Sequence, residues 1–176
     1  MDLYKVTTEK LKELKTWAQV RSPKPLQPAL SYALDWLAPE LLGTGFRMLE
    51  ISDFSIKACV PARQTNFDFN KQVHQGLVVN AGLELSRAFL QKQMAESIFQ
   101  VTSSDVSLTK KQSWTGDLEI VLETDQAVMD DFFIDLQKKK KAEIVFDFKI
   151  KIADNKKSDS MRIAQVIEKT ELIGQI

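Results

Sequence analysis

The chain has 176 residues, of which 44% are apolar and 27% are charged, which predicts one globular domain with a sizeable core. Its 24 basic and 24 acidic residues cancel, and this balance argues against a protein built around nucleic acid. The single cysteine, Cys59, excludes an intrachain disulfide, and the single histidine, His74, excludes a metal site with several histidines.

The first 28 residues predict a short helix followed by an extended lead-in. Residues 7–20 repeat apolar side chains at helical spacing, and residues 23–28 contain three prolines. Charged side chains near the N-terminus argue against a signal peptide, and no uncharged apolar run approaches the ~20 residues needed to span a bilayer. We therefore expect a cytoplasmic protein in which residues 1–28 precede a single domain over residues 29–176.

The next part of the chain predicts a helix and two strands. The helix is expected over residues 29–42, before two glycines. The strands are expected over residues 46–51 and 54–61, and the second alternates apolar and polar residues as a half-buried strand does. Cys59 falls in this second strand and is expected to behave as a small buried hydrophobe. A polar loop over residues 63–73 then leads to a helix start.

Residues 76–94 predict a central helix, because apolar residues cover most of the helical wheel. The polar exceptions Asn80, Glu84, Arg87 and Gln91 recur at spacings of four, three and four, so they share one face of the helix.

The second half of the chain predicts four strands, one helix and a tight turn. The strand over residues 98–109 breaks its alternation, which indicates a bulge, and the helix is expected to begin at a cap formed by Thr124 or Asp125. Antiparallel strands packed on one central helix give a two-layer α+β fold. In chain order these elements are a strand over residues 98–109, a strand over 117–123, a helix over 126–136, a strand over 143–152, a turn over 154–157 and a strand over 160–169.

Four segments carry a resemblance to a known family: residues 42–47, residues 66–70, the helix start His74-Gln75-Gly76, and the closing hairpin over residues 142–169. On these segments the chain resembles the hotdog superfamily, and within it a thioesterase-related group with a helical insertion before the last two strands. The resemblance covers about residues 29–170. It implies a hotdog fold, in which a curved antiparallel sheet of about six strands wraps a long central helix; this chain adds N-terminal helices. It also implies a homodimer or homotetramer whose active site lies between subunits.

The substrate that the resemblance implies is an acyl-CoA or other acyl thioester, with coenzyme A as part of the substrate and no separate cofactor or metal. Hydrolysis needs a donor for the carbonyl oxygen and a carboxylate that activates water. The first backbone N–H groups of a helix are unpaired and lie at its positive end, so Gly76, with Gln75, is the candidate donor. Glu84 is the candidate base, and Asn80 lies between them on the same face.

Several polar side chains could contact substrate or have a purely structural role. His74 either touches substrate or bonds to its own backbone, and Asn66 and Asn70 either position substrate or shape the loop. Glu84 either acts as a base or pairs with Arg87 three residues later. A further group could hold the phosphates of coenzyme A, although the lysine run within it also suits a solvated helix end. This group consists of Arg63, Lys110, Lys111 and the run Lys138 to Lys141.

Two functions remain open from these residues. The first is an acyl-CoA thioesterase that hydrolyses a fatty-acyl or related thioester. The second is a non-catalytic protein that binds acyl-CoA or a fatty-acyl group. The families that the chain resembles often place the acid at the position of Leu83, one residue before Glu84, and this displacement favours the second function.

Overall fold

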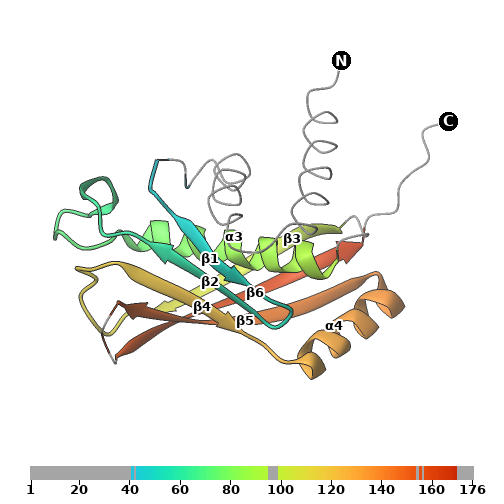
Figure 1. Ribbon diagram of the computed structural model, residues 1–176. Coiled ribbons are helices and arrows are strands. Elements are labelled where there is room, and N and C mark those ends of the chain that lie inside the picture. Colours follow the sequence, from blue (N-terminus) through green and yellow to red (C-terminus); the bar gives the residue numbers. More distant parts are fainter. Residues whose placement is uncertain (1–40, 42, 95–98, 154, 156, 170–176) are drawn as a thin grey trace, which may run out of the picture.

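The computed structural model describes residues 41, 43–94, 99–153, 155 and 157–169 (Figure 1). The helix expected over residues 7–20, nearly all of the one expected over 29–42, and the boundary expected after residue 28 lie outside this part.

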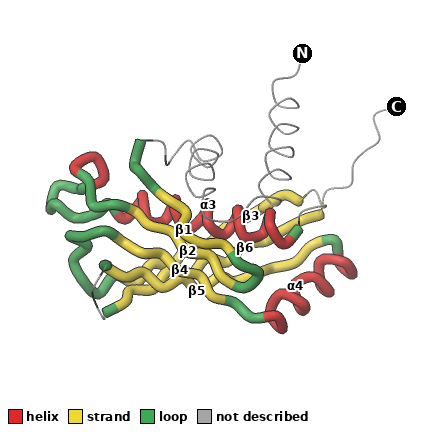
Figure 2. Tube along the Cα trace, in the orientation of Figure 1, coloured by secondary structure: helices red, strands yellow, loops and turns green. Residues whose placement is uncertain are grey.

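Six strands form one antiparallel sheet in the order β1-β2-β4-β5-β6-β3, and the long helix α3 (Gln75–Gln93) lies across one face of it (Figures 1 and 2). A second helix, α4 (Gln126–Lys139), connects β4 to β5. The α+β hotdog architecture, with its helical insertion before the last two strands, is confirmed. The strands are β1 (Arg47–Ile51), β2 (Ser55–Val60), β3 (Phe99–Thr109), β4 (Leu118–Glu123), β5 (Lys141–Ile152) and β6 (Ser158–Lys169).

A glycine lets α3 approach the sheet closely. A Cβ on Gly82 would lie 3.0 Å from Cδ1 of Ile163 on β6 and would collide with the Met161 side chain. On either side of this contact, the helix buries its apolar face in the core, as the apolar helical wheel predicted. The buried apolar residues of α3 are Val78, Ala81, Leu85, Phe89 and Leu90.

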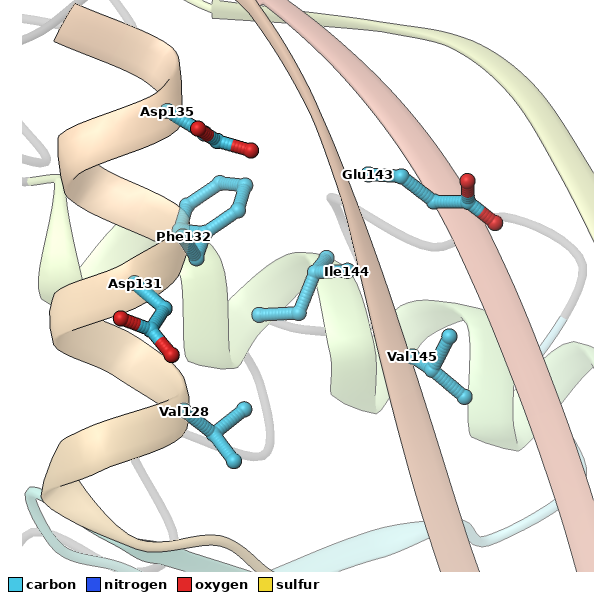
Figure 3. A pocket seen from close by; sticks show the side chains of 7 residues that line it. All are labelled: Val128, Asp131, Phe132, Asp135, Glu143, Ile144 and Val145. Atoms are coloured by element: carbon cyan, nitrogen blue, oxygen red, sulfur yellow. The ribbon is translucent and has the colours of Figure 1, made fainter.

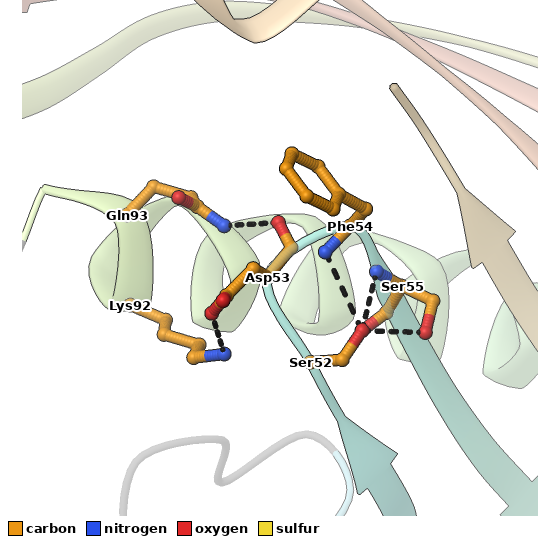
Figure 4. A network of polar contacts seen from close by, with 6 residues as sticks. All are labelled: Ser52, Asp53, Phe54, Ser55, Lys92 and Gln93. Atoms are coloured by element: carbon orange, nitrogen blue, oxygen red, sulfur yellow. Dashed lines mark hydrogen bonds and ion pairs between the residues drawn. The ribbon is translucent and has the colours of Figure 1, made fainter. Parts of the chain in front are cut away.

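The C-terminal end of α3 is tied to the turn between β1 and β2 (Figure 4). Lys92 Nζ donates to Asp53 Oδ1 at 2.7 Å, and Gln93 Nε2 donates to the Asp53 carbonyl oxygen at 2.6 Å. Within the turn, Ser52 Oγ accepts from the Ser55 N–H at 2.9 Å. The position of this end of the helix is therefore set by the hairpin.

Local details of two elements agree with their sequence signals, and one helix is longer than expected. The expected bulge appears as a register shift between Val101 and Ser103 of β3. Asp125, rather than Thr124, caps α4, since its Oδ1 accepts from the Val128 N–H at 2.9 Å. The helix runs three residues past the expected end at residue 136, because lysine is a good helix former, and it stops at Lys140, which has a φ of 56°.

Cys59 is buried, as expected for a small hydrophobe, with 7% of its surface exposed. Burial raises the pKa of its thiol, and the Arg47 guanidinium, 3.9 Å from the sulfur, offsets this only in part. The thiol is therefore neutral and poorly nucleophilic near pH 7.

Strand β5 alternates strictly between the core and the outer face, as its sequence predicted. Phe146 is 1% exposed and packs edge-on against Phe89 of α3, with ring centroids 6.0 Å apart. Phe148, also buried, lies on the same strand, and its ring centroid is 6.4 Å from that of Phe146. The aromatic cluster joins the helix to the middle of the sheet.

Phe146→Ala is expected to lower the free energy of unfolding by about 3–5 kcal/mol, because it opens a cavity under α3. Urea denaturation measures this loss. Val145→Ala is the matched control, since Val145 points to the outer face and is 38% exposed, and it should cost less than about 1 kcal/mol. A loss below about 1 kcal/mol for Phe146→Ala would show that the inner face is misassigned.

Candidate functional site

The first two residues of α3, Gln75 and Gly76, are exposed, and their backbone N–H groups differ in hydrogen bonding. His74 is the N-cap, and its Nδ1 accepts from the Gly76 N–H at 3.0 Å. The Leu77 N–H bonds to the His74 carbonyl oxygen at 3.1 Å. Among the described residues nothing accepts a hydrogen bond from the Gln75 N–H. Of the two candidate donors, Gln75 is therefore available, whereas Gly76 is already engaged by His74.

Glu84 is buried on α3 and is paired with a neighbour on its own helix. It is 8% exposed, and its Oε1 accepts from Arg87 Nη1 at 2.8 Å. The Arg87 side chain is 51% exposed, so the ion pair reaches the surface. This is the i, i+3 pairing considered from the sequence.

Gly76, Asn80 and Glu84 follow one face of α3, as expected, but they are spread along the helix. Eight residues separate Gly76 from Glu84, which corresponds to about 12 Å along the axis. An oxyanion donor and a base that serve one carbonyl group each lie about 3 Å from its reacting atoms. A single chain therefore does not bring Gly76 and Glu84 to the same thioester, and Asn80 lies half-buried between them.

Asn66 shapes the loop before α3. It is 3% exposed, and its amide donates to the carbonyl oxygens of Thr44 and Pro61, both at 2.8 Å. The backbone carbonyl oxygen of Asn66 accepts from the His74 N–H at 2.9 Å. Since both amide hydrogens are used, Asn66 holds the loop in place rather than offering a donor to a ligand.

Two other candidates from the sequence lie on exposed parts of the same loop. Asn70 is exposed, and its backbone N–H bonds to Asp68 Oδ1 at 2.8 Å within a tight turn. Arg63 is exposed, and its guanidinium lies against Gly45, whose φ of 72° and missing side chain leave room for it. The Arg63 carbonyl oxygen accepts from the Asn66 N–H at 2.9 Å, so Arg63 belongs to the loop that Asn66 joins to the helix start.

The lysine run lies at the opposite end of the sheet from the helix start. Lys141 opens β5 and pairs with Glu168 at 2.7 Å. The helix start lies beside Asp159 at the other end of β6, where Asp159 is opposite Ile150. Nine residues of strand separate Lys141 from Ile150, about 30 Å. The run therefore forms the solvated end of α4 and does not serve the helix start of the same chain.

Sequence reasoning missed a buried polar contact beside the helix start. Trp114 is fully buried, and its Nε1 donates to Asp159 Oδ2 at 2.6 Å. The Trp114 carbonyl oxygen accepts from the Val73 N–H at 2.8 Å. Asp159 occupies an inward position in the alternation of β6, between a turn and Met161, and a carboxylate at such a position is the signal that could have identified it.

A groove of about 370 Å³ lies between α4 and β5 (Figure 3). Apolar side chains, among them Phe132 and Ile144, line it together with Asp131, Asp135 and Glu143. The groove opens near the Lys141 end of β5, and its carboxylates would repel the phosphates of coenzyme A. It is therefore not the acyl-CoA site expected at the helix start.

In the described ranges, no three or more His, Cys, Asp or Glu side chains gather where they could hold a metal ion. None of the helices in this part of the chain is both long and apolar enough to cross a membrane.

No family model matches the chain, and no curated protein matches its sequence. Solved structures do match its fold. A Pseudomonas aeruginosa protein described as a probable thioesterase has a TM-score of 0.67 and 12% identity, covering 85% of this chain and 97% of that one. A Chlorobaculum tepidum protein of unknown function has a TM-score of 0.65 and 16% identity, covering 85% and 98%. A Haemophilus influenzae thioesterase has a TM-score of 0.58 and 11% identity, covering 82% and 93%. The chain thus has the hotdog fold of these thioesterase-like proteins.

Proposed function

We propose that the chain hydrolyses acyl thioesters, such as acyl-CoA, at the start of α3. The observation that carries this proposal is the exposed Gln75 N–H, which has no acceptor among the described residues and lies at the positive end of a 19-residue helix. In this role it donates to the thioester carbonyl oxygen as negative charge develops there. Such a donor contributes about 3–4 kcal/mol of transition-state stabilisation. The His74 ring takes the space that a side chain on Gly76 would fill, with its Cε1 and Nδ1 3.0 and 3.1 Å from the position of a Cβ, so Gly76 serves the cap of the helix.

The carboxylate in this mechanism comes from a second copy of the chain, because the nine residues from Gln75 to Glu84 correspond to about 14 Å along one helix. Glu84 of one copy takes a proton from a water molecule, and the water oxygen attacks the carbonyl carbon at the helix start of the other copy. The tetrahedral intermediate then collapses, the carbon–sulfur bond breaks, and Glu84 returns the proton to the departing sulfur, so that the thiol and the free acid leave. We assign to the Asn80 amide, on the same face of the helix, the role of orienting the substrate or the water.

The second copy is expected to bind along β3. This strand is the last in the sheet order, so within the described residues only its β6 side is paired. Its inward apolar residues are incompletely covered, and Val106 is 37% exposed. An unpaired edge with open apolar side chains favours continuation of the sheet into another copy.

Val106→Lys is therefore expected to convert a dimer, of twice the 20.0 kDa chain mass, into a monomer. The added charge is solvated in a monomer and buried in the dimer. Sedimentation at micromolar concentration measures the change. Val145→Lys, on the outer face of the interior strand β5, is the matched control and should leave the mass unchanged. A wild-type protein that sediments only as a monomer would eliminate the shared site.

A non-catalytic acyl-CoA binding protein is the second candidate, and the Glu84–Arg87 ion pair favours it, since the pair gives the carboxylate a structural role. A thiol-release assay over acyl-CoAs from acetyl to palmitoyl, run beside calorimetric binding, separates the two. The proposed thioesterase releases thiol, and its affinity rises with chain length by up to about 0.8 kcal/mol per buried methylene. Saturable binding without release for any chain length would establish the binding protein instead.

A further inference from the structure

We propose that Asp159 and Trp114 are positioning residues for the helix-start donors. Together with Lys110, they hold residues Gln72 and Val73 in a contact network that we call the Trp114 clamp. This inference rests on the proposed function, because it assigns the clamp the task of orienting the Gln75 and Gly76 N–H groups toward a substrate.

The fixed point of the clamp is the Asp159 carboxylate. Asp159 is 2% exposed and lies on β6, paired with Ile150 of the interior strand β5. Its Oδ1 accepts from the Lys111 N–H at 2.6 Å, and its Oδ2 accepts from Trp114 Nε1 at 2.6 Å. Both bonds are short and charge-assisted, a class roughly twice as strong as neutral hydrogen bonds. The segment that carries Trp114 is therefore fixed to the sheet.

The clamp holds the chain just before the helix. The Trp114 carbonyl oxygen accepts from the N–H of Val73, a residue with no exposed surface. Lys110 Nζ donates to Gln72 Oε1 at 2.7 Å and lies 4.7 Å from the centroid of the Trp114 ring. On the other side, Asn66 accepts from the His74 N–H. Each of the three residues before Gln75 thus has its own hydrogen bond to a neighbouring segment.

These contacts matter for catalysis because a donor must point at the position that the oxyanion will occupy. A misplacement of about 1 Å can lower a rate about 100-fold. The other end of α3 is tied separately, through Lys92 and Gln93 to Asp53 (Figure 4). The clamp, together with the Asn66 bond to His74, therefore sets the direction of the first N–H groups.

Asp159→Asn tests the clamp with little change of shape. The amide keeps one acceptor, so it satisfies either the Lys111 N–H or Trp114 Nε1 but not both. Lys110→Met is a second variant, at a half-buried position. Methionine keeps an apolar side chain over the Trp114 ring and removes the hydrogen bond to Gln72. Gln93→Ala is the matched control, because it releases the opposite end of the same helix.

The measurements are amide hydrogen exchange along α3 and steady-state kinetics with an acyl-CoA. In Asp159→Asn we expect exchange at the hydrogen-bonded amides of residues 72–74 and 76–77 to rise about tenfold or more while residues 88–93 stay protected. We expect kcat to fall about 10–100-fold with KM nearly unchanged, the pattern of lost transition-state orientation. Lys110→Met should show the same pattern with a smaller effect, and Gln93→Ala should raise exchange only at residues 88–93.

Two results would overturn the clamp: unchanged exchange at residues 72–77 in both variants, or faster exchange there with kcat and KM unaltered in an active enzyme. A uniform rise in exchange along the whole helix would also overturn it, since that indicates general destabilisation. A wild-type protein that hydrolyses no thioester would instead overturn the proposed function. Hydrogen exchange at residues 72–77 would still show whether the clamp contacts hold the helix start, so the two failures can be told apart.

Discussion

Gln75→Pro is expected to lower kcat for acyl-CoA hydrolysis about 10²–10³-fold, the usual effect of removing one oxyanion donor. Proline has no N–H, and position 75 is the first residue of α3, where proline is well tolerated. The preceding residue, His74, has φ −63° and ψ 130°, a conformation that a following proline favours. Stability should therefore hardly change, and steady-state kinetics beside thermal unfolding measures both quantities.

Gln75→Ala is the control for this variant, because it removes the side chain and keeps the N–H, and it should retain wild-type turnover. If Gln75→Pro is fully active, the Gln75 N–H is not the donor. The competing donor is then the Gly76 N–H, which His74 engages at 3.0 Å. In that case His74→Ala should raise kcat by releasing the Gly76 N–H, at the cost of about 1 kcal/mol of stability for the lost cap.

Glu84→Gln is expected to lower turnover about 10²–10⁴-fold, the range for a positioned acid–base group. The change preserves the shape of the side chain and removes its charge. Acyl-CoA binding should persist or tighten, because a negative charge near an anionic ligand is gone. Kinetics and calorimetry on the same preparation measure both effects.

A structural role for Glu84 predicts a different result. The carboxylate is 8% exposed and bonded to Arg87, so Glu84→Gln and Arg87→Gln would each weaken folding. The double variant would then cost less than the sum of the two single variants. Loss of stability with unchanged turnover would assign Glu84 to the ion pair and remove it from the mechanism.

Mixing two inactive variants tests whether one site uses two chains. In a mixed dimer of Gln75→Pro and Glu84→Gln copies, one of the two sites combines an intact helix start with an intact Glu84. Random reassortment makes half of the dimers mixed, so the mixture should recover about a quarter of wild-type activity. Each variant reassorted with itself should recover none. Absence of recovery in verified mixed dimers would place both groups in one chain or remove one of them from the site.

The layers of this protein were predictable from its sequence because burial leaves a periodic trace. The apolar wheel of α3 and the strict alternation of β5 each report which face meets the core. The bulge in β3 was predictable for the same reason, since an extra residue breaks the alternation. These signals are local, so they do not depend on where the rest of the chain goes.

Only the tertiary structure decided which polar groups meet at the helix start. Trp114 and Asp159 are 45 residues apart, and their contact depends on the path of β6 beneath the loop before α3. The sequence offered the Gly76 N–H as a donor, but the ring of His74 folds back onto it and leaves Gln75 available. From the sequence, the lysine run was likewise a candidate for binding the phosphates of coenzyme A. In the structure, the length of β5 lies between this run and the helix start. Periodicity states which side of an element is buried, whereas hydrogen-bond partners depend on distances between segments that only the folded chain sets.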